Sequence, residues 1–160
     1  MGRFYVENWE VAAALERMAG LLAIKEENQY KSRAYSMASR QINRLACSLK
    51  QLSAEGRLRE IPGVGEALEK KIEELINTGK CRFLAELESE VSPELLALYE
   101  IPGVGLKTAH KLYAGLGLRS LRELEQAAKD GRLHSIPGLG SNLEESILAF
   151  FEQRPRYAET

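Results

Sequence analysis

Apolar residues recur along most of the chain at intervals of three and four, which is the spacing of one face of an α-helix. A first set with this spacing follows Asn8, a residue type that favours helix N-caps, and a second set follows Tyr30. The two sets are Val11, Leu15, Met18 and Leu22, and Tyr35, Ala38, Ile42, Leu45 and Leu49. No segment shows the sustained alternation of a half-buried β-strand. The pattern therefore predicts an all-α fold.

A five-residue segment, Ile-Pro-Gly-hydrophobic-Gly, occurs three times, at residues 61–65, 101–105 and 136–140. Each copy precedes a stretch with helical apolar spacing. These stretches contain Leu68, Ile72, Leu75 and Ile76 after the first copy, Ala109, Leu112 and Leu116 after the second, and Leu143, Ile147 and Phe150 or Phe151 after the third. Unequal intervals between the copies favour a few embedded motifs over a regular solenoid. We expect two small helical subdomains that carry the three motifs.

The composition of this segment suits a turn that binds phosphate. Proline ends the preceding helix, and the glycines free the backbone of side chains, so a ligand approaches it closely. The next helix begins with unpaired N–H groups and the positive end of its dipole, which attract a phosphate oxygen. The candidate phosphate-binding residues are Gly63, Val64, Gly65 and Lys70, then Gly103, Val104, Gly105, Lys107 and Lys111, and finally Gly138 and Gly140.

The third copy differs in its charge. Two acids, Glu144 and Glu145, lie in the first turns of the helix that follows Gly140, and no base lies there. Negative charge at this position opposes phosphate binding. Two interpretations of this copy stay open, a phosphate-binding turn and a turn that only packs two helices together.

Charge is unevenly distributed along the chain, although its formal net charge is only −1. Residues 31–59 contain seven Lys or Arg side chains and one Glu, whereas residues 61–100 contain four bases and nine acids. A chain with segregated charge presents a basic face to nucleic acid even when its total charge is near zero. Arg33, Arg40 and Arg44 share one face of the predicted second helix and form a candidate basic face. The alternative is an ordinary solvated face.

Three copies of the segment, each before an amphipathic helix, resemble the helix-hairpin-helix family of DNA-binding motifs. Most of the chain, about residues 8–150, is also similar to the N-terminal region of family X DNA polymerases of the bacterial and archaeal type. The residues that carry this similarity are Tyr30-Lys31-Ser32-Arg33-Ala34-Tyr35, then residues 72–80 and residues 116–124, in the order and spacing of the family. The resemblance implies a lyase-type domain over residues 1–80 with the first hairpin. It implies a DNA-holding subdomain over residues 81–160 with the other two.

The same resemblance implies roles for individual residues. Lys71 stands at the position of the family's lyase lysine, whose amine forms an imine with a ring-opened abasic sugar. Lys31, Tyr35 and Arg59 stand where the family binds a 5′-phosphate. Ala67 departs from the pattern, because the family's most active lyases have a further lysine there. The alternatives are a solvated or phosphate-contacting Lys71 and a Tyr35 that belongs to the core.

No cofactor is required by any residue pattern, and no firm metal site is found. The family resemblance implies a monovalent cation, Na⁺ or K⁺, at the hairpin carbonyls of residues 61–65 and 101–105. A single aspartate, Asp130, and two histidines, His110 and His134, supply no carboxylate cluster and no histidine-rich metal site. Neither polymerase nor nuclease activity is therefore expected from this chain alone. Two arrangements stay open, a natural stand-alone module and the N-terminal part of a longer native chain with a catalytic domain downstream.

Three functions remain compatible with the sequence. The first is a sequence-independent DNA-binding module of repair type that grips phosphates at gaps, nicks or ends. The second is a deoxyribose-phosphate lyase that uses Lys71, and the third is a protein-interaction scaffold. No apolar run is long enough for a membrane span, and the amino terminus lacks a secretory signal's apolar core. We expect a cytoplasmic, nucleoid-associated protein with DNA as its partner and no contact with membranes.

Overall fold

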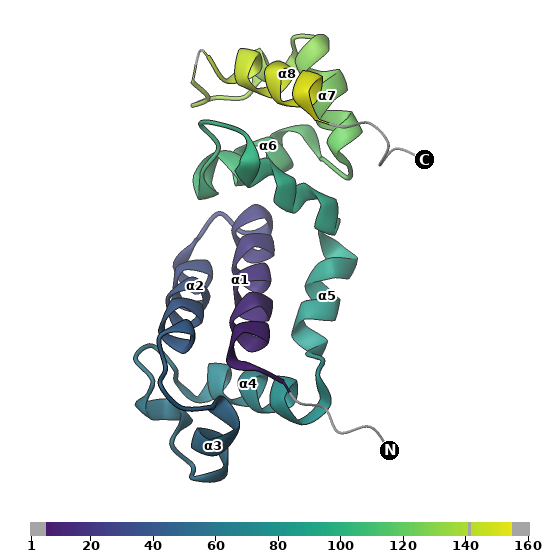
Figure 1. The fold of residues 1–160 in the computed structure, drawn as a ribbon. Helices are drawn as coiled ribbons and strands as arrows, with labels where there is room; N and C mark the ends of the chain where they lie inside the picture. The colour runs from purple at the N-terminus through teal and green to yellow at the C-terminus, as the bar shows by residue number, and fades with distance from the viewer. Residues whose placement is uncertain (1–5, 141, 155–160) are drawn as a thin grey trace. The chain divides into compact units, whose positions relative to one another are not determined.

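The computed structural model describes residues 6–140 and 142–154. Within these residues the chain is helical and has no β-strand, which confirms the all-α fold expected from the apolar spacing. The α-helices are α1 (Asn8–Lys25), α2 (Tyr30–Asn43), α3 (Leu49–Ala54), α4 (Glu66–Thr78), α5 (Arg82–Glu90), α6 (Leu106–Leu116), α7 (Leu121–Lys129) and α8 (Leu143–Gln153). Short 3₁₀ helices, η1 (Leu58–Glu60), η2 (Pro93–Glu100) and η3 (Arg132–Ser135), precede α4, α6 and α8 (Figure 1).

The described residues form two compact units. Unit 1 contains the described part of residues 1–22 together with Asn28–Glu90, and therefore α2 to α5. Unit 2 contains Ala23–Glu27 and the described part of residues 91–160. Each unit has its own core and its own hairpins, so each is described by itself.

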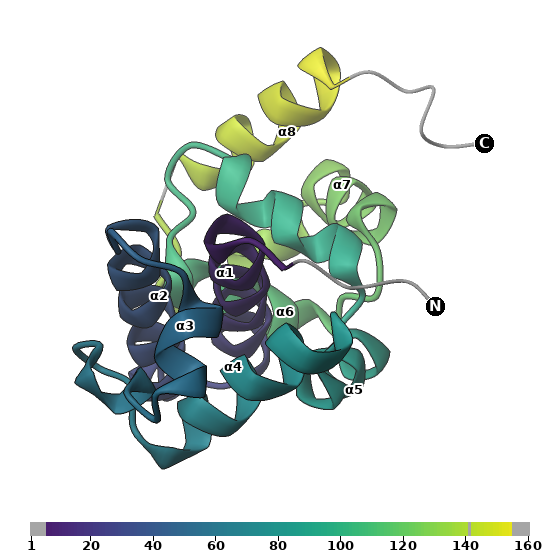
Figure 2. The same ribbon diagram turned by 60° about the horizontal axis from the view of Figure 1, so that its bottom comes forward.

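Helices α1 and α2 of unit 1 lie antiparallel and side by side (Figures 1 and 2). Two buried serines on α2 fasten them together: Ser32 donates to the Ala19 carbonyl and Ser39 to the Ala12 carbonyl, both at 2.7 Å. Small side chains allow the two backbones to approach closely, and the hydroxyls find carbonyl acceptors without water. The face of α2 with the serines is therefore turned to α1, and its opposite face is turned to solvent.

Asn8 has a different role from the one predicted. We expected it to cap α1, but α1 begins at Asn8 itself, and Glu7 precedes it with its carbonyl accepting from Glu10 N–H at 3.0 Å. The Asn8 side chain instead donates to the Cys47 carbonyl at 2.9 Å and accepts from Leu49 N–H at 2.8 Å. It thus connects the start of α1 to the start of α3, a long-range contact that no local sequence signal announces.

Unit 2 is held by a capped helix and a close approach of backbone. Ser120 and Glu123 form a reciprocal capping box at the start of α7, which packs against α8. Gly115 on α6 lies under Ile136, because a Cβ at residue 115 would meet the isoleucine side chain at 2.9 Å. The third Ile-Pro-Gly segment is therefore packed directly on α6. No described helix combines the length and the apolar composition that crossing a bilayer requires.

We predict that Asn8→Ala lowers the free energy of unfolding by about 1–3 kcal/mol, because it leaves Cys47 O and Leu49 N–H without their side-chain partner. Urea denaturation followed by circular dichroism measures this change. Asn28→Ala is the matched control, since the Asn28 side chain accepts one exposed bond, from Tyr30 N–H. Equal losses in the two variants would contradict the bridging role of Asn8.

Candidate nucleic-acid interface

Two of the three Ile-Pro-Gly segments have the same backbone conformation. In hairpin 1 (residues 61–65) and hairpin 2 (residues 101–105), the first isoleucine carbonyl accepts from the valine N–H at 3.0 Å. The first glycine has a positive φ, 88° at Gly63 and 91° at Gly103. The second glycine caps the following helix, with φ and ψ of −105° and −164° at Gly65 and −101° and −165° at Gly105. The repeat seen in the sequence is therefore a repeat of structure.

Both hairpins end in a helix whose first N–H groups are unpaired within the helix. The first intrahelical bond runs from Glu69 N–H to Gly65 O in α4 and from Ala109 N–H to Gly105 O in α6, at 2.9 Å each. The preceding N–H groups of each helix therefore lack an intrahelical acceptor. Nothing lies within 4 Å of a Cβ placed on Gly65 or Gly105, so the surface above these donors is open. An anion reaches the backbone here without displacing a side chain.

Hairpin 3 (residues 136–140) shares the positive φ of the first glycine, 81° at Gly138, but differs at the start of its helix. That helix begins at Leu143, with Asn142 as N-cap, rather than directly after Gly140. The Lys111 ammonium group donates to the Gly138 carbonyl at 3.2 Å, and a Cβ at Gly138 would meet that nitrogen at 2.7 Å. Hairpin 3 is thus held on α6 by a lysine side chain as well as by Ile136.

Some of the basic residues around hairpin 2 are bonded to other parts of unit 2, and one is not. Lys111 is bonded to hairpin 3, and His110 Nδ1 lies 2.9 Å from the Ile24 carbonyl. Lys107 is exposed in the first turn of α6 and forms no ion pair with a described residue, and that turn has no acid. Lys107 is therefore the lysine of α6 that remains available to an anion at hairpin 2.

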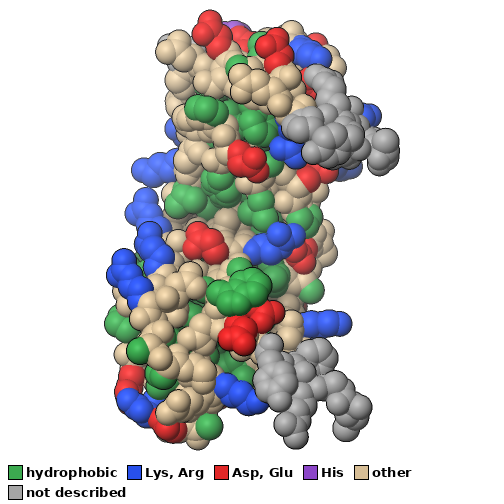
Figure 3. Space-filling view, viewed as in Figure 1, with side chains coloured by type: hydrophobic (Ala, Val, Ile, Leu, Met, Phe, Trp, Pro, Cys, Tyr) green, Lys and Arg blue, Asp and Glu red, His purple; other side chains and the backbone are tan. Residues whose placement is uncertain are grey.

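Among the described residues of unit 1, the basic face of α2 is the largest group of cations without an ion-pair partner. Lys31, Arg33, Arg40 and Arg44 are all exposed, and none pairs with a carboxylate among the described residues. Lys and Arg side chains accordingly gather over α2 at the edge of the molecule (Figure 3). The sequence prediction brought these residues to one helix, and the structure leaves their charges unneutralised by the described chain.

The other cations near hairpin 1 are neutralised by neighbouring acids. Arg59 Nε lies 3.0 Å from Glu69 Oε1, and Lys70 Nζ lies 3.5 Å from Glu66 Oε1. Both were predicted to bind phosphate, and a phosphate would have to compete with these carboxylates for them. Because both acids belong to the start of α4, the two pairs also cancel the negative charge beside the hairpin.

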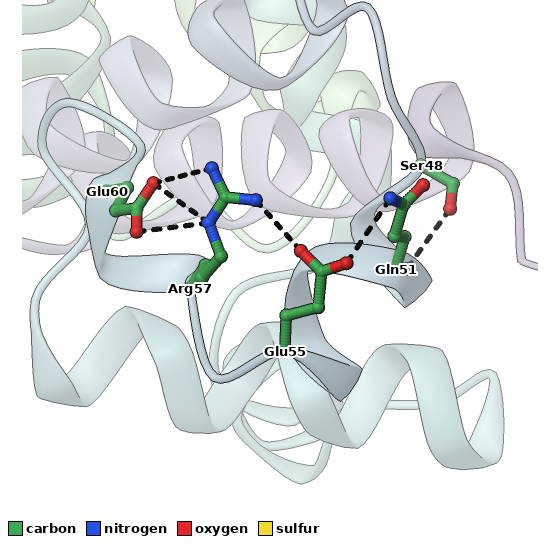
Figure 4. A network of polar contacts seen from close by, with 5 residues as sticks. All are labelled: Ser48, Gln51, Glu55, Arg57 and Glu60. Atoms are coloured by element: carbon green, nitrogen blue, oxygen red, sulfur yellow. Dashed lines mark hydrogen bonds and ion pairs between the residues drawn. The ribbon is translucent and has the colours of Figure 1, made fainter.

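Arg57 belongs to a separate network at the bend that leads into η1 (Figure 4). Its guanidinium binds Glu60 at 3.0 Å and Glu55 at 2.8 Å, and Gln51 extends the chain of contacts to Glu55. Hydrogen bonds from Arg57 hold the pKa of both the Glu55 and Glu60 carboxyls below the usual value. The network is exposed and lies just before hairpin 1 in the chain. Because Arg57 is paired with two carboxylates, we do not count it with the basic face of α2.

Lys71 lies in an aromatic environment that the sequence did not announce. Its ammonium nitrogen is 4.8 Å from the centre of the Phe83 ring and 5.8 Å from that of Tyr35. The two rings contact each other at 6.0 Å between centroids. Tyr35 is itself buried, so the structure places it in the core as well as beside Lys71. Phe83 comes from α5, and its spacing in the sequence carried no sign of this contact.

No group of three or more His, Cys, Asp or Glu side chains in the described part of the chain is arranged to hold a metal ion. Cys47 is half-buried and Cys81 is buried, and both are free thiols. The chemistry visible in the described residues is therefore that of backbone amides, cations and one partly enclosed lysine.

Comparison with known proteins agrees with this geometry. A helix-hairpin-helix domain model matches residues 6–81, and a model of a SAM-like helix-hairpin-helix tandem matches residues 93–153. The chain is 29% identical over 139 residues to the DNA polymerase/3′-5′ exonuclease PolX of Bacillus subtilis (strain 168), an alignment that covers 87% of this chain and 24% of that protein. It is 34% identical over 76 residues to DNA polymerase lambda of Arabidopsis thaliana, covering 47% of this chain and 14% of the relative.

The chain thus spans about a quarter or less of the length of these relatives. The first matched domain contains hairpin 1, and the tandem contains hairpins 2 and 3. The chain belongs to the helix-hairpin-helix family and is homologous to the N-terminal region of family X DNA polymerases.

Proposed function

We propose that this chain binds DNA through its phosphate backbone, without sequence preference, and favours gaps, nicks or ends. The observation that carries the proposal is the shared geometry of hairpins 1 and 2, in which an open glycine stands before unpaired helix N–H groups. The relatives are DNA polymerases by name, which supports DNA as the ligand. In this proposal the chain is a module of DNA repair, located with the nucleoid in the cytoplasm.

Backbone donors recognise phosphate oxygens and carry no information about the bases. Binding that neutralises phosphates releases counterions, so the affinity falls steeply as salt rises. Each unit has one hairpin of the open kind, so the chain grips two short stretches of backbone. An interrupted duplex offers two such stretches of backbone, one on each side of a flexible gap.

We assign hairpin 3 to packing and not to DNA. Its Gly138 carbonyl is bonded to Lys111, Ile136 lies on Gly115, and its helix starts later than the other two after the second glycine. Glu144 near the helix start also pairs with His134, at 3.4 Å. A phosphate would meet the exposed Glu145 carboxylate there, which has no ion-pair partner among the described residues, whereas the first-turn acids of α4 are paired with Arg59 and Lys70.

Hairpin 3 also supports the cation that the family resemblance implies. The Lys111 ammonium on Gly138 O is a positive charge held by the carbonyl of the first hairpin glycine. Hairpins 1 and 2 have the same positive φ at this glycine and no lysine in place. We therefore propose that carbonyls within residues 61–65 and 101–105 hold Na⁺ or K⁺, which would lower the repulsion between the carbonyls and a bound phosphate.

We predict that Gly65→Ala and Gly105→Ala each weaken DNA binding about tenfold, because the added methyl group obstructs the charge-assisted bonds of backbone N–H groups to phosphate. Neither change strains the fold, since both glycines have negative φ and open space around the Cβ position. Fluorescence anisotropy on intact duplex and on a gapped duplex with and without a 5′-phosphate, each at two salt concentrations, measures the change.

Gly140→Ala is the matched control for hairpin 3, because nothing lies within 4 Å of a Cβ there either. We expect it to leave the affinity unchanged. A loss equal to that of Gly105→Ala would show that hairpin 3 binds DNA. If the unaltered chain binds none of the DNAs at low salt, the DNA-binding proposal is wrong and the hairpins serve a protein-interaction scaffold.

A second candidate function, deoxyribose-phosphate lyase, is favoured by the surroundings of Lys71. Its amine has no carboxylate partner among the described residues, whereas the neighbouring Lys70 pairs with Glu66. The aromatic contacts hold it on α4, the helix of hairpin 1. In this reaction the unprotonated amine attacks the aldehyde carbon of the opened sugar and water leaves to form an imine. The sugar carbon next to the imine then loses a proton, and the 3′-phosphate leaves.

We predict that borohydride traps a covalent adduct between the chain and a 5′-incised abasic site, and that Lys71→Ala abolishes the adduct. Lys70→Ala is the control and retains it, because Lys70 is exposed and committed to Glu66. The adduct is resolved by denaturing electrophoresis. Equal trapping in the Lys71→Ala variant would rule out Lys71 as the nucleophile, and DNA binding by both variants is checked in parallel.

A further inference from the structure

The ammonium group of Lys71 lies against two aromatic rings. Its nitrogen is closer to the centre of the Phe83 ring, at 4.8 Å, than to that of Tyr35, at 5.8 Å, and both distances allow a ring face to attract a cation. The two rings also contact each other, and Tyr35 is buried, so a core residue supports Phe83. Lys71 and Phe83 are themselves half-buried, and both therefore remain partly accessible to solvent.

The short connection between α4 and α5 determines where the Phe83 ring lies. Gly79 ends α4 in the left-handed conformation, with a φ of 75°, and its N–H donates to the Leu75 carbonyl at 2.8 Å. The Glu74 carboxylate on α4 then accepts from the backbone N–H of Arg82 at 3.0 Å. Because Arg82 is the first residue of α5, this bond fixes the turn of α5 that contains Phe83.

The acids of α4 leave Lys71 to the rings. Three of the four, Glu66, Glu69 and Glu74, form ion pairs with other residues of the described chain. The fourth, Glu73, is two residues from Lys71, and side chains at this spacing on a helix do not face each other. A carboxylate beside the amine would favour its protonated form, which cannot attack a carbonyl carbon. A ring face holds the side chain through a weaker contact.

The amine of a lysine needs to be held in place if it is to react efficiently. The side chain has four rotatable bonds, so a lysine in solvent spreads its amine over many positions. Attack on an aldehyde requires the nitrogen at about 3–3.5 Å from the carbon, in one direction. A contact that confines the side chain before the substrate arrives removes part of this entropic cost from the reaction step.

We propose that Phe83 is a positioning residue of the lyase reaction, and that its ring face holds the Lys71 side chain where the amine reaches the aldehyde carbon of an opened abasic sugar. The inference rests on the proposed lyase function and adds a second residue to it. Phe83 exchanges no proton and forms no bond, so the covalent steps remain those of the Lys71 amine. The imine nitrogen becomes a cation again when it takes a proton from water, and the same ring face then attracts it.

The first test measures borohydride trapping on a 5′-incised abasic site by the unaltered chain, Phe83→Leu and Phe83→Tyr. Leucine keeps an apolar side chain but has no ring face, whereas tyrosine keeps the ring. We expect Phe83→Leu to lower the rate constant of adduct formation at saturating DNA about fivefold, which is the size of a partly exposed cation–π contact. The DNA concentration at half-saturation should not change. Phe83→Tyr should restore the rate.

Phe150→Leu is the matched control. Phe150 on α8 in unit 2 is also half-buried, and the Arg154 guanidinium lies over its ring at 5.4 Å. We expect this variant to form the adduct at the rate of the unaltered chain. Thermal unfolding of each variant separates a loss of stability from a loss of positioning.

A second measurement needs no substrate. Ring currents of Phe83 should move the carbon–proton NMR signal of the Lys71 ε-methylene group upfield in the unaltered chain. The signal is assigned by its loss in Lys71→Arg. The upfield shift should disappear in Phe83→Leu and persist in Phe83→Tyr.

Three outcomes overturn the proposal, and they are distinguishable. If Phe83→Leu forms the adduct as fast as the unaltered chain and Lys71→Ala forms none, the lyase function stands and Phe83 does not position its nucleophile. If the Lys71 signal of the unaltered chain shows no upfield shift, the amine does not rest on the ring, whatever the variants do. If the unaltered chain forms no adduct, the lyase function is wrong and this inference fails with it.

Discussion

The geometry of the Ile-Pro-Gly turn is the constraint on which the rest of the structure depends. The isoleucine is buried in all three copies, and the first glycine takes a positive φ that a side chain would disfavour. In hairpins 1 and 2 the second glycine then stands as the N-cap of a helix without any side-chain cap bond. A helix that begins in this way keeps its first donors for a ligand, whereas the capping box on α7 uses such donors internally. The lack of a side-chain cap thus leaves the first N–H donors of α4 and α6 without an internal acceptor, which the proposed phosphate contacts require.

Hairpin 3 shows that the motif alone does not decide its use. Its five residues match the other copies, yet its surroundings turn it into a packing element. Lys111 occupies the Gly138 carbonyl, and Gly115 lets Ile136 come close to α6. Both residues lie on the helix of hairpin 2, so hairpin 2 supplies the residues that hold hairpin 3. In unit 2, hairpin 2 is therefore open to solvent, and hairpin 3 is packed against the helix that follows hairpin 2.

Local rules predicted much of this protein, and long-range contacts account for what they missed. Glycine, proline and apolar spacing were sufficient to predict the all-α fold, the three turns and the basic face of α2. The spacing was wrong about Leu45 and Leu49, which it placed on one helix with Tyr35: α2 ends at Asn43, and Leu49 begins α3. Nothing in the spacing of the sequence could show that Arg59 meets Glu69, that Lys111 meets Gly138, or that Lys71 lies against Phe83. Each of these pairs joins different elements through the fold. The predicted cap at Asn8 was wrong for the same reason. A cap is inferred from neighbouring residues, whereas the hydrogen-bond partners of the Asn8 side chain lie near residue 48. The sequence therefore predicted which residues are candidates better than it predicted which of them remain available to a ligand, because ion pairs and hydrogen bonds within the fold occupy some of them.

The availability of charged side chains explains how a chain with a net charge of −1 presents a basic face. The acids are not spread evenly against the bases: they neutralise Arg57, Arg59 and Lys70 close to hairpin 1. The described carboxylates do not neutralise the arginines of α2, whose core face carries serines bonded to α1. Because the serines fix which side of α2 is buried, they also fix where the arginines point. The packing of two helices in unit 1 thereby determines the chemistry of the surface beside its hairpin.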